Sequence, residues 1–250
     1  MTLKPHPTPA LLPEVNFSEQ GDVRHLHLGT PWVQGSMLMS APFDLELEYV
    51  RRMMVGLLFV DLDQIAQGHA MQLGLGAGAL TKFCYKKLGM RTTAIELNPQ
   101  VLAVCRQWFK LPPNDARLAV VLADAAQEIQ KTHYAGTVDV LHVDLYDDDA
   151  AAPVLNSANF YADCAALLSH QGVMTVNLFG RDTSCAQSLE KISLVFGAQA
   201  VWVVDPTREG NTIVLAQKRA RRAIVALFAV FRADKDPFDF LHPIRWRLEV

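Results

Sequence analysis

A glycine-rich stretch followed by an acidic residue constrains the fold of this chain more than any other feature. Residues 69–80 read HAMQLGLGAGAL, so an apolar run leads directly into three glycines, Gly74, Gly76 and Gly78. The apolar spacing predicts a buried strand at 70–73 and a helix at 80–88, which places the glycines in the turn between them. Such a turn needs backbone angles that side chains disfavour, and it lets a ligand approach the main chain closely. The stretch therefore predicts a ligand-binding turn.

Glu96 strengthens this prediction. It ends the next predicted strand, 92–96, and lies 20 residues beyond Gly76. In doubly wound sheets an acidic residue at that distance accepts hydrogen bonds from ribose hydroxyls, beside a glycine turn that holds the rest of the nucleotide or nucleoside. Three glycines alone could simply begin a helix. The strand, the turn, the helix and Glu96 together favour a nucleoside-type cofactor.

Predicted strands and helices alternate from residue 69 to about residue 200. This alternation specifies a parallel sheet covered by helices on both faces. Two further strands, 200–204 and 212–217, are separated only by residues 205–211, which suits an antiparallel hairpin at the edge of the sheet. A sheet with that ending resembles the class I methyltransferase fold, a Rossmann-like α/β architecture with seven strands.

We expect four segments along the chain. They are a proline-rich flexible leader, a small antiparallel β unit, a Rossmann-like cofactor-binding catalytic domain, and a C-terminal helix and tail, at 1–13, 14–43, 44–218 and 219–250. The catalytic domain is expected to open with a helix at 44–59 that Asp44 caps, and Asn98 should cap another. The apolar residues 223–231 are predicted to form a helix that packs on the body or contacts a second copy in a homodimer.

Composition favours a soluble enzyme and argues against several classes of partner. The net charge is −3, and the basic run at 218–222 lacks an aromatic-rich basic face, so nucleic acid is not expected as a partner. The four cysteines have neither metal-binding nor disulfide spacing, so we expect no metal site. No apolar run approaches the roughly 18 residues of a membrane span. A cytoplasmic protein without membrane contact is therefore expected.

A narrower resemblance runs from about residue 22 to residue 217. It rests on an ordered set of residues: Val33-Gln34, Tyr49, the glycine turn, Glu96, Asp124-Ala125, Asp144-Leu145-Tyr146-Asp147, Phe160-Tyr161 and Gly172-Val173. This order resembles the spermidine synthase family of polyamine aminopropyltransferases, which also carry a small N-terminal β unit. In that family an acceptor amine attacks the carbon next to the sulfonium of decarboxylated S-adenosylmethionine, and methylthioadenosine leaves.

The resemblance implies a set of residues that bind this co-substrate. Glu96 would bind the ribose hydroxyls, and Asp124 with Ala125 would bind the adenine. Gln34 and the glycine turn would complete the site.

The resemblance also implies an acceptor site with a general base. Asp144 would deprotonate the attacking amine, Asp147 stands at the second acidic position of the family, and Tyr49 and Tyr146 would bind the amine substrate. The chemistry supports these roles independently, because an ammonium group has no lone pair until a base removes a proton. The further carboxylates of 147–149 would attract a polyamine, although they could also simply solvate a loop.

The chain departs from the family pattern in the half that recognises the decarboxylated cofactor and the diamine. Ala77 stands where the family has an aspartate that holds the aminopropyl amine, and Arg51 stands where it has a glutamate. After the fourth strand the family usually reads Asp-Ser-Ser-Asp-Pro, whereas residues 144–148 read DLYDD.

Three functions remain open on this evidence. The first is aminopropyl transfer from decarboxylated S-adenosylmethionine to an amine acceptor in polyamine biosynthesis. The second, favoured by Ala77, is methyl transfer from S-adenosylmethionine on the same fold. The third is a catalytically silent nucleoside-binding or interaction protein.

Overall fold

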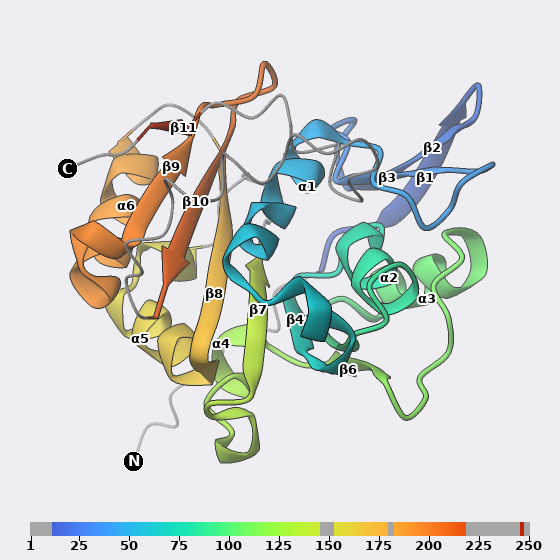
Figure 1. The fold of residues 1–250 in the computed structure, drawn as a ribbon. Helices are drawn as coiled ribbons and strands as arrows, with labels where there is room; N and C mark the ends of the chain where they lie inside the picture. Colours follow the sequence, from blue (N-terminus) through green and yellow to red (C-terminus); the bar gives the residue numbers. More distant parts are fainter. Residues whose placement is uncertain (1–11, 146–152, 180–182, 219–245, 248–250) are drawn as a thin grey trace, which may run out of the picture.

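The computed structural model describes residues 12–145, 153–179, 183–218 and 246–247, and it shows an α/β fold with two sheets (Figure 1). The smaller sheet is antiparallel and contains β1 (Val15–Gln20), β2 (Val23–Leu28) and β3 (Gly35–Leu38). It is the predicted N-terminal β unit. Its buried residues Leu26 and Met37 share a core cluster with the glycine turn, so this unit packs directly on the predicted binding region.

The larger sheet has the strand order β11-β9-β10-β8-β7-β4-β5-β6. Its strands are β4 (His69–Leu73), β5 (Arg91–Glu96), β6 (Leu118–Leu122), β7 (Val138–Val143), β8 (Leu168–Phe179), β9 (Val201–Val204), β10 (Asn211–Gln217) and β11 (Trp246–Arg247). The five strands from β8 to β6 are parallel, whereas β10 pairs antiparallel with both β8 and β9. The seven predicted strands and the edge hairpin are confirmed, and the two-residue β11 adds a partner at the β9 edge.

Helices cover both faces of this sheet, as the alternation predicts (Figure 1). One face packs against α4 (Ala125–Glu128), α5 (Ala158–Leu167) and α6 (Thr183–Phe196). The other packs against α1 (Glu48–Met53), α2 (Ala79–Lys86) and α3 (Pro99–Trp108). Short 3₁₀ helices complete the described part of the chain: η1 (Met54–Phe59), η2 (Leu62–Gln67), η3 (Thr132–Tyr134), η4 (Pro153–Asn156) and η5 (Ala198–Ala200). Both faces of the parallel strands are therefore buried.

The predicted helix at 44–59 is wrong in its first and last parts. The α-helix begins after Leu47, and Asp44 pairs with Lys87 of the α2 end instead of capping it. The segment then tightens into η1, where Gly56 lies so close to β8 that an added Cβ would sit 3.0 Å from Val173. Packing on the sheet thus overrides the local helical pattern. Asn98 does cap α3, since its side chain accepts from the backbone N–H of Gln100 at 2.9 Å.

Some expectations fall outside the described residues. They concern most of the leader, the acidic stretch with Tyr146, Asp147, Asp148 and Asp149, and the apolar segment 223–231. Within the described ranges, none of the helices has the length and hydropathy needed to cross a membrane. The same ranges contain no group of three or more His, Cys, Asp or Glu side chains placed to hold a metal ion.

Candidate active site

The glycine turn joins β4 to α2 at the carboxyl end of the sheet. Gly74 has φ +82°, and a Cβ there would collide with the backbone carbonyl oxygen of Asp144 at the end of β7. Gly76 has φ +51°, and its Cβ would lie 3.2 Å from the carbonyl oxygen of Gln34. Left-handed backbone and close neighbours both require glycine at these two positions. The turn therefore lies in close contact with the end of β7 on one side and with the N-terminal β unit on the other.

Gly78 and Ala77 lie deeper than the sequence suggests. Gly78 has φ +68°, begins α2 and packs near Leu111, and it is not among the residues that line the cavity described below. The structure therefore gives Gly78 a conformational role and does not place it against a ligand. Ala77 is buried beneath β3, because a Cβ on Gly35 would lie 2.7 Å from the Ala77 Cβ. The position at which the family carries an aspartate is thus covered by the chain itself.

Gln72 braces the turn from within the sheet, and sequence reasoning missed it. Its side-chain oxygen accepts from the backbone N–H of Thr81 at 3.0 Å, and its amide donates to the carbonyl of Leu75 at 3.3 Å. A glutamine inside an otherwise apolar buried strand is the signal that could have revealed it, because a buried amide needs hydrogen-bond partners.

Glu96 connects the end of β5 to the turn. One carboxylate oxygen accepts from the backbone N–H of Leu75 at 2.8 Å, and the other accepts from that of Asn98 at 2.7 Å. Burial raises the pKa of Glu96 from its ordinary value, while these backbone donors act in the opposite direction. Each carboxylate oxygen can accept more than one hydrogen bond, so the fixed carboxylate can still receive two ribose hydroxyls.

A cavity of about 350 Å³ lies along this edge of the sheet. Its walls combine apolar side chains with three carboxylates, and the residues that line it are Leu28, Gln34, Gly74, Gly76, Ile95, Glu96, Leu97, Val101, Ala123, Asp124, Ala125, Ala126, Asp144, Leu145 and Val154. Asp124 also caps α4 by accepting from the Ala126 N–H at 2.8 Å. The structure therefore brings the expected co-substrate residues together, apart from Gly78.

The carboxylates at this cavity suit a ligand that carries hydroxyl or amino groups and positive charge. Glu96 offers oxygens to a sugar, and Asp124 offers them to an exocyclic amine. The negative field of Glu96, Asp124 and Asp144 attracts a sulfonium or an ammonium group. The apolar walls, including Leu28, match the faces of a purine ring.

Asp144 also lines the cavity, just beyond β7. One carboxylate oxygen accepts from the side-chain amide of Asn177 at 2.9 Å, and the other accepts from the hydroxyl of Tyr49 at 3.4 Å. Burial raises the pKa of Asp144 to about 6, although both hydrogen bonds act to lower it. Burial and the neighbouring carboxylate also raise the pKa of Tyr49 well above its ordinary value, so Tyr49 acts as a neutral donor. Asp144 can therefore accept a proton near neutral pH.

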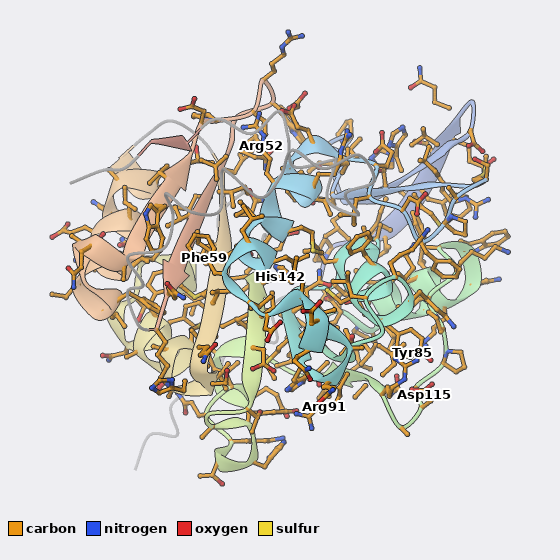
Figure 2. The ribbon with its side chains drawn as sticks, viewed as in Figure 1. Arg52, Phe59, Tyr85, Arg91, Asp115 and His142 are labelled. Carbon is orange, nitrogen blue, oxygen red and sulfur yellow. The ribbon has the colours of Figure 1, made fainter. Side chains whose placement is uncertain are left out.

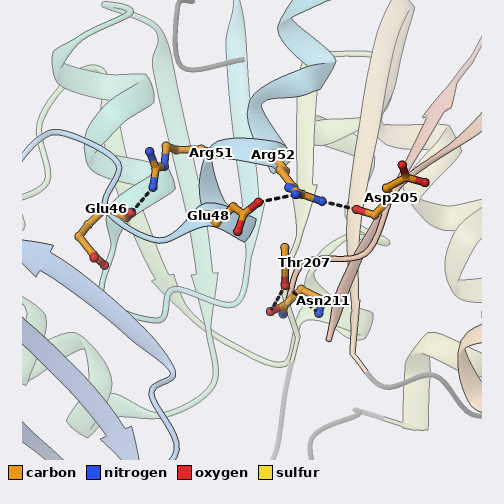
Figure 3. A network of polar contacts seen from close by, with 7 residues as sticks. All are labelled: Glu46, Glu48, Arg51, Arg52, Asp205, Thr207 and Asn211. Carbon is orange, nitrogen blue, oxygen red and sulfur yellow. Dashed lines mark hydrogen bonds and ion pairs between the residues drawn. The ribbon is translucent and has the colours of Figure 1, made fainter. Parts of the chain in front are cut away.

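Arg51 does not line the cavity. Its guanidinium donates to the backbone carbonyl of Glu46 at 2.9 Å, in the loop before α1. Figure 3 shows Arg51 and Arg52 diverging from the helix, with Arg52 reaching Glu48 and the carbonyl of Asp205. The charge of Arg51 therefore engages its own loop and is not directed at the lining of the cavity.

Comparison with known proteins places this fold and cavity in a family. The sequence model of the spermine/spermidine synthase domain matches residues 74–223. The chain belongs to the spermine/spermidine synthase family. It is 34% identical over 215 residues to a polyamine aminopropyltransferase of Chromobacterium violaceum, covering 86% of this chain and 80% of that protein. It is 35% identical over 212 residues to one of Neisseria meningitidis, covering 84% and 78%.

Solved structures agree on the fold. A probable spermidine synthase from Corynebacterium glutamicum matches with TM-score 0.74 at 18% identity, covering 97% of this chain and 92% of that one. Human methyltransferase-like protein 13, solved in complex with SAH, matches with TM-score 0.63 at 23% identity, covering 78% and 98%. The predicted class I methyltransferase-type architecture is confirmed. The family is one of transferase enzymes, and it supports aminopropyl transfer in polyamine biosynthesis ahead of the two alternatives.

Proposed function

We propose that this protein transfers an aminopropyl group from decarboxylated S-adenosylmethionine to a small amine acceptor. The observation that carries the proposal is that Asp144 lines the same cavity as Glu96 and the glycine turn. One cavity thus offers oxygens for a ribose and a proton acceptor for an amine. The protein needs only small dissolved substrates for this reaction, and we place it in the cytoplasm.

Binding of the donor would use the half of the cavity built on β4, β5 and β6. Glu96 would receive the ribose hydroxyls, Asp124 and Ala125 would face the adenine, and Gln34 would close the site from the N-terminal β unit. Related chains support an S-adenosylmethionine-like ligand, since one matched neighbour was solved with SAH and a spermidine synthase with the transition state analogue AdoDATO, at TM-score 0.60.

The chemical step would begin when Asp144 removes a proton from the acceptor ammonium. The freed lone pair forms a bond to the propyl carbon next to the sulfonium, the carbon–sulfur bond breaks, and its electron pair remains on sulfur. Asp144 keeps the proton, and Tyr49 holds the carboxylate in place through its hydroxyl. With a pKa of about 6, Asp144 is ionised at neutral pH and still basic enough to assist. Asp147 and Tyr146 remain predicted members of this acceptor site.

Calorimetry with three ligands tests the donor assignment. We expect decarboxylated S-adenosylmethionine and methylthioadenosine to bind at least as tightly as S-adenosylmethionine, because the carboxylates at the cavity disfavour an added carboxylate on the ligand. If S-adenosylmethionine binds tenfold tighter than its decarboxylated form, a difference of about 1.4 kcal/mol, the aminopropyl assignment is wrong. That result would favour methyl transfer, for which Ala77 is the specific observation.

A further inference from the structure

A chain of buried polar side chains runs from the hairpin at the sheet edge to Asp144. The parallel register pairs Val143 with Val176, so Asp144 and Asn177 follow as neighbours at the ends of β7 and β8. On the other side of β8, the side-chain amide of Asn211 donates to the Asn177 side-chain oxygen at 3.1 Å. Asn177 is 1% exposed and Asn211 is 9% exposed, so both side chains are largely removed from solvent.

The three side-chain hydrogen bonds that link Thr207 to Asp144 all run in one direction, with each donor on the side away from Asp144. The Thr207 hydroxyl donates to the Asn211 side-chain oxygen at 3.5 Å, Asn211 donates to Asn177, and Asn177 donates to Asp144 at 2.9 Å. Because the oxygen of each amide receives a donor from the hairpin side, its NH₂ group faces Asp144. A reversed Asn177 would set its oxygen against the carboxylate and leave the Asn211 donor facing another donor.

Thr207, the first residue of this row of hydrogen bonds, lies in a turn that is bonded to the helix that also carries Tyr49. Thr207 lies in the β9–β10 turn, where its backbone N–H donates to the Asn211 carbonyl at 2.8 Å. Arg52 of α1 donates to the carbonyl of Asp205 in the same turn and pairs with Glu48 (Figure 3). Tyr49 and Asn177, the two side chains of the described residues that donate to Asp144, are therefore linked through α1 and the edge hairpin.

We propose that Asn211 is a positioning residue for aminopropyl transfer, which orients the Asn177 amide so that Asn177 donates to the Asp144 carboxylate and aims it at the acceptor amine. The proposal rests on the proposed function for its effect on turnover. Its structural part, the orientation of Asp144 and the stabilisation of its ionised form, stands on the hydrogen bonds alone.

The groups that face Asp144 determine how a variant would titrate. His142, on the same face of β7, bonds Thr175 at 2.8 Å and is neutral near pH 6, because burial lowers its pKa to about 4. Tyr49 of α1 is also neutral. The acidic residues 147–149 follow in the chain outside the described residues. Among the described residues, Asn177 makes the shorter of the two side-chain hydrogen bonds to the carboxylate, so loss of its orientation removes stabilisation from the ionised form and raises the pKa of Asp144.

The test is Asn211→Leu, which keeps the number and branching of the side-chain heavy atoms and removes the amide, with Asn211→Gln as the conservative variant. We expect the acid limb of the kcat profile to move up by about one pH unit, with about fivefold less activity at pH 6 and recovery above pH 8. The acceptor KM and donor binding should stay within twofold. Asn211→Gln should keep the acid limb close to that of the wild type, and Thr212→Val, a buried neighbour on the same strand, should leave the profile unchanged.

A titration that needs no substrate separates this proposal from the proposed function. Carboxyl ¹³C NMR follows the Asp144 signal, assigned by its absence in Asp144→Asn, in the wild type and in Asn211→Leu. A higher midpoint in Asn211→Leu supports the positioning role even if no aminopropyl transfer is observed. An unchanged midpoint in a folded Asn211→Leu protein overturns it, and so does an activity loss that Asn211→Gln and Thr212→Val reproduce equally.

Discussion

The two halves of the cavity are built in different ways. The donor half is built largely from main chain, since the turn at Gly74 and Gly76 and the backbone donors to Glu96 set its shape. The acceptor half is built from side chains, since Tyr49 and Asn177 come from distant segments to hold Asp144. Backbone geometry leaves a strong sequence pattern, whereas side-chain networks can be rebuilt with other residues.

This difference explains where the chain departs from its family. The residues that would hold the adenosine, namely the glycines of the turn, Glu96 and Asp124, are kept, whereas Ala77 in the same turn replaces the aspartate that holds the aminopropyl amine in the family. Because β3 covers Ala77, a substituent there would have to displace Gly35 before it reached a ligand. We infer that recognition of the adenosine is inherited intact and that recognition of the aminopropyl tail and of the acceptor amine depends more heavily on Asp144.

The largest expected effect comes from the acceptor half. Asp144→Asn should lower turnover by about 10²–10⁴-fold, the usual contribution of general acid–base catalysis, while donor affinity changes less than twofold. Stopped assays of amine product and calorimetry of donor binding measure the two quantities. Asp63→Asn, an exposed carboxylate in η2, is the control. Full turnover in Asp144→Asn would remove Asp144 as the base.

Gly74→Ala tests the backbone nature of the donor half. Its Cβ would collide with the Asp144 carbonyl at φ +82°, so we expect a loss of about 3–5 kcal/mol in the free energy of unfolding. Gly76→Ala is the matched comparison, because its Cβ would lie 3.2 Å from the carbonyl oxygen of Gln34. Its loss in the free energy of unfolding should come mainly from the left-handed backbone and amount to about 1–2 kcal/mol. Urea denaturation measures both, and equal losses would contradict the close approach of Gly74 to β7.

Glu96→Gln should weaken donor binding by about 1–3 kcal/mol, because a neutral amide accepts weaker hydrogen bonds from ribose than a carboxylate does. The effect should appear in the binding constant of methylthioadenosine and hardly at all in the acceptor KM. Glu128→Gln, which alters a buried carboxylate paired with Lys131 away from the cavity, controls for general loss of stability. Undiminished nucleoside binding in Glu96→Gln would exclude the ribose contact.

An effect similar in size to that of Glu96→Gln concerns the sheet beneath both halves. Burial lowers the pKa values of His69 and His142 to about 4, so the unfolded chain binds more protons than the folded one between pH 4 and 6.5. Stability should therefore fall as the pH drops through this window, by about 2 kcal/mol for each histidine. Figure 2 places His142 in the interior, and Cys84 of α2 lies 3.9 Å from its Nε2. His142→Gln should make the urea midpoint depend less on pH. An unchanged dependence of the midpoint on pH would show that His142 does not contribute to this loss of stability.

Local patterns predicted the parts of this molecule that depend on local physics. The glycine turn, the alternating strands and the Asn98 cap follow from backbone angles, apolar period and side-chain capping. The cap predicted for Asp44 failed because Lys87, far along the chain, pairs with it instead.

The side-chain network around Asp144 could not be predicted from local patterns in the same way. Asn177 and Asn211 meet because β8 and β10 are neighbours, and their register becomes visible only in three dimensions. The available signal was a polar residue in each of two apolar strands. A buried amide requires a partner, but the sequence does not say which one.

A turnover assay with decarboxylated S-adenosylmethionine and a panel of small amines, followed by mass spectrometry, tests the central claim most directly. The account predicts equal amounts of methylthioadenosine and of an amine heavier by one aminopropyl group, with both lost in Asp144→Asn. Release of S-adenosylhomocysteine from S-adenosylmethionine together with a methylated amine, and no aminopropylated product, would contradict it.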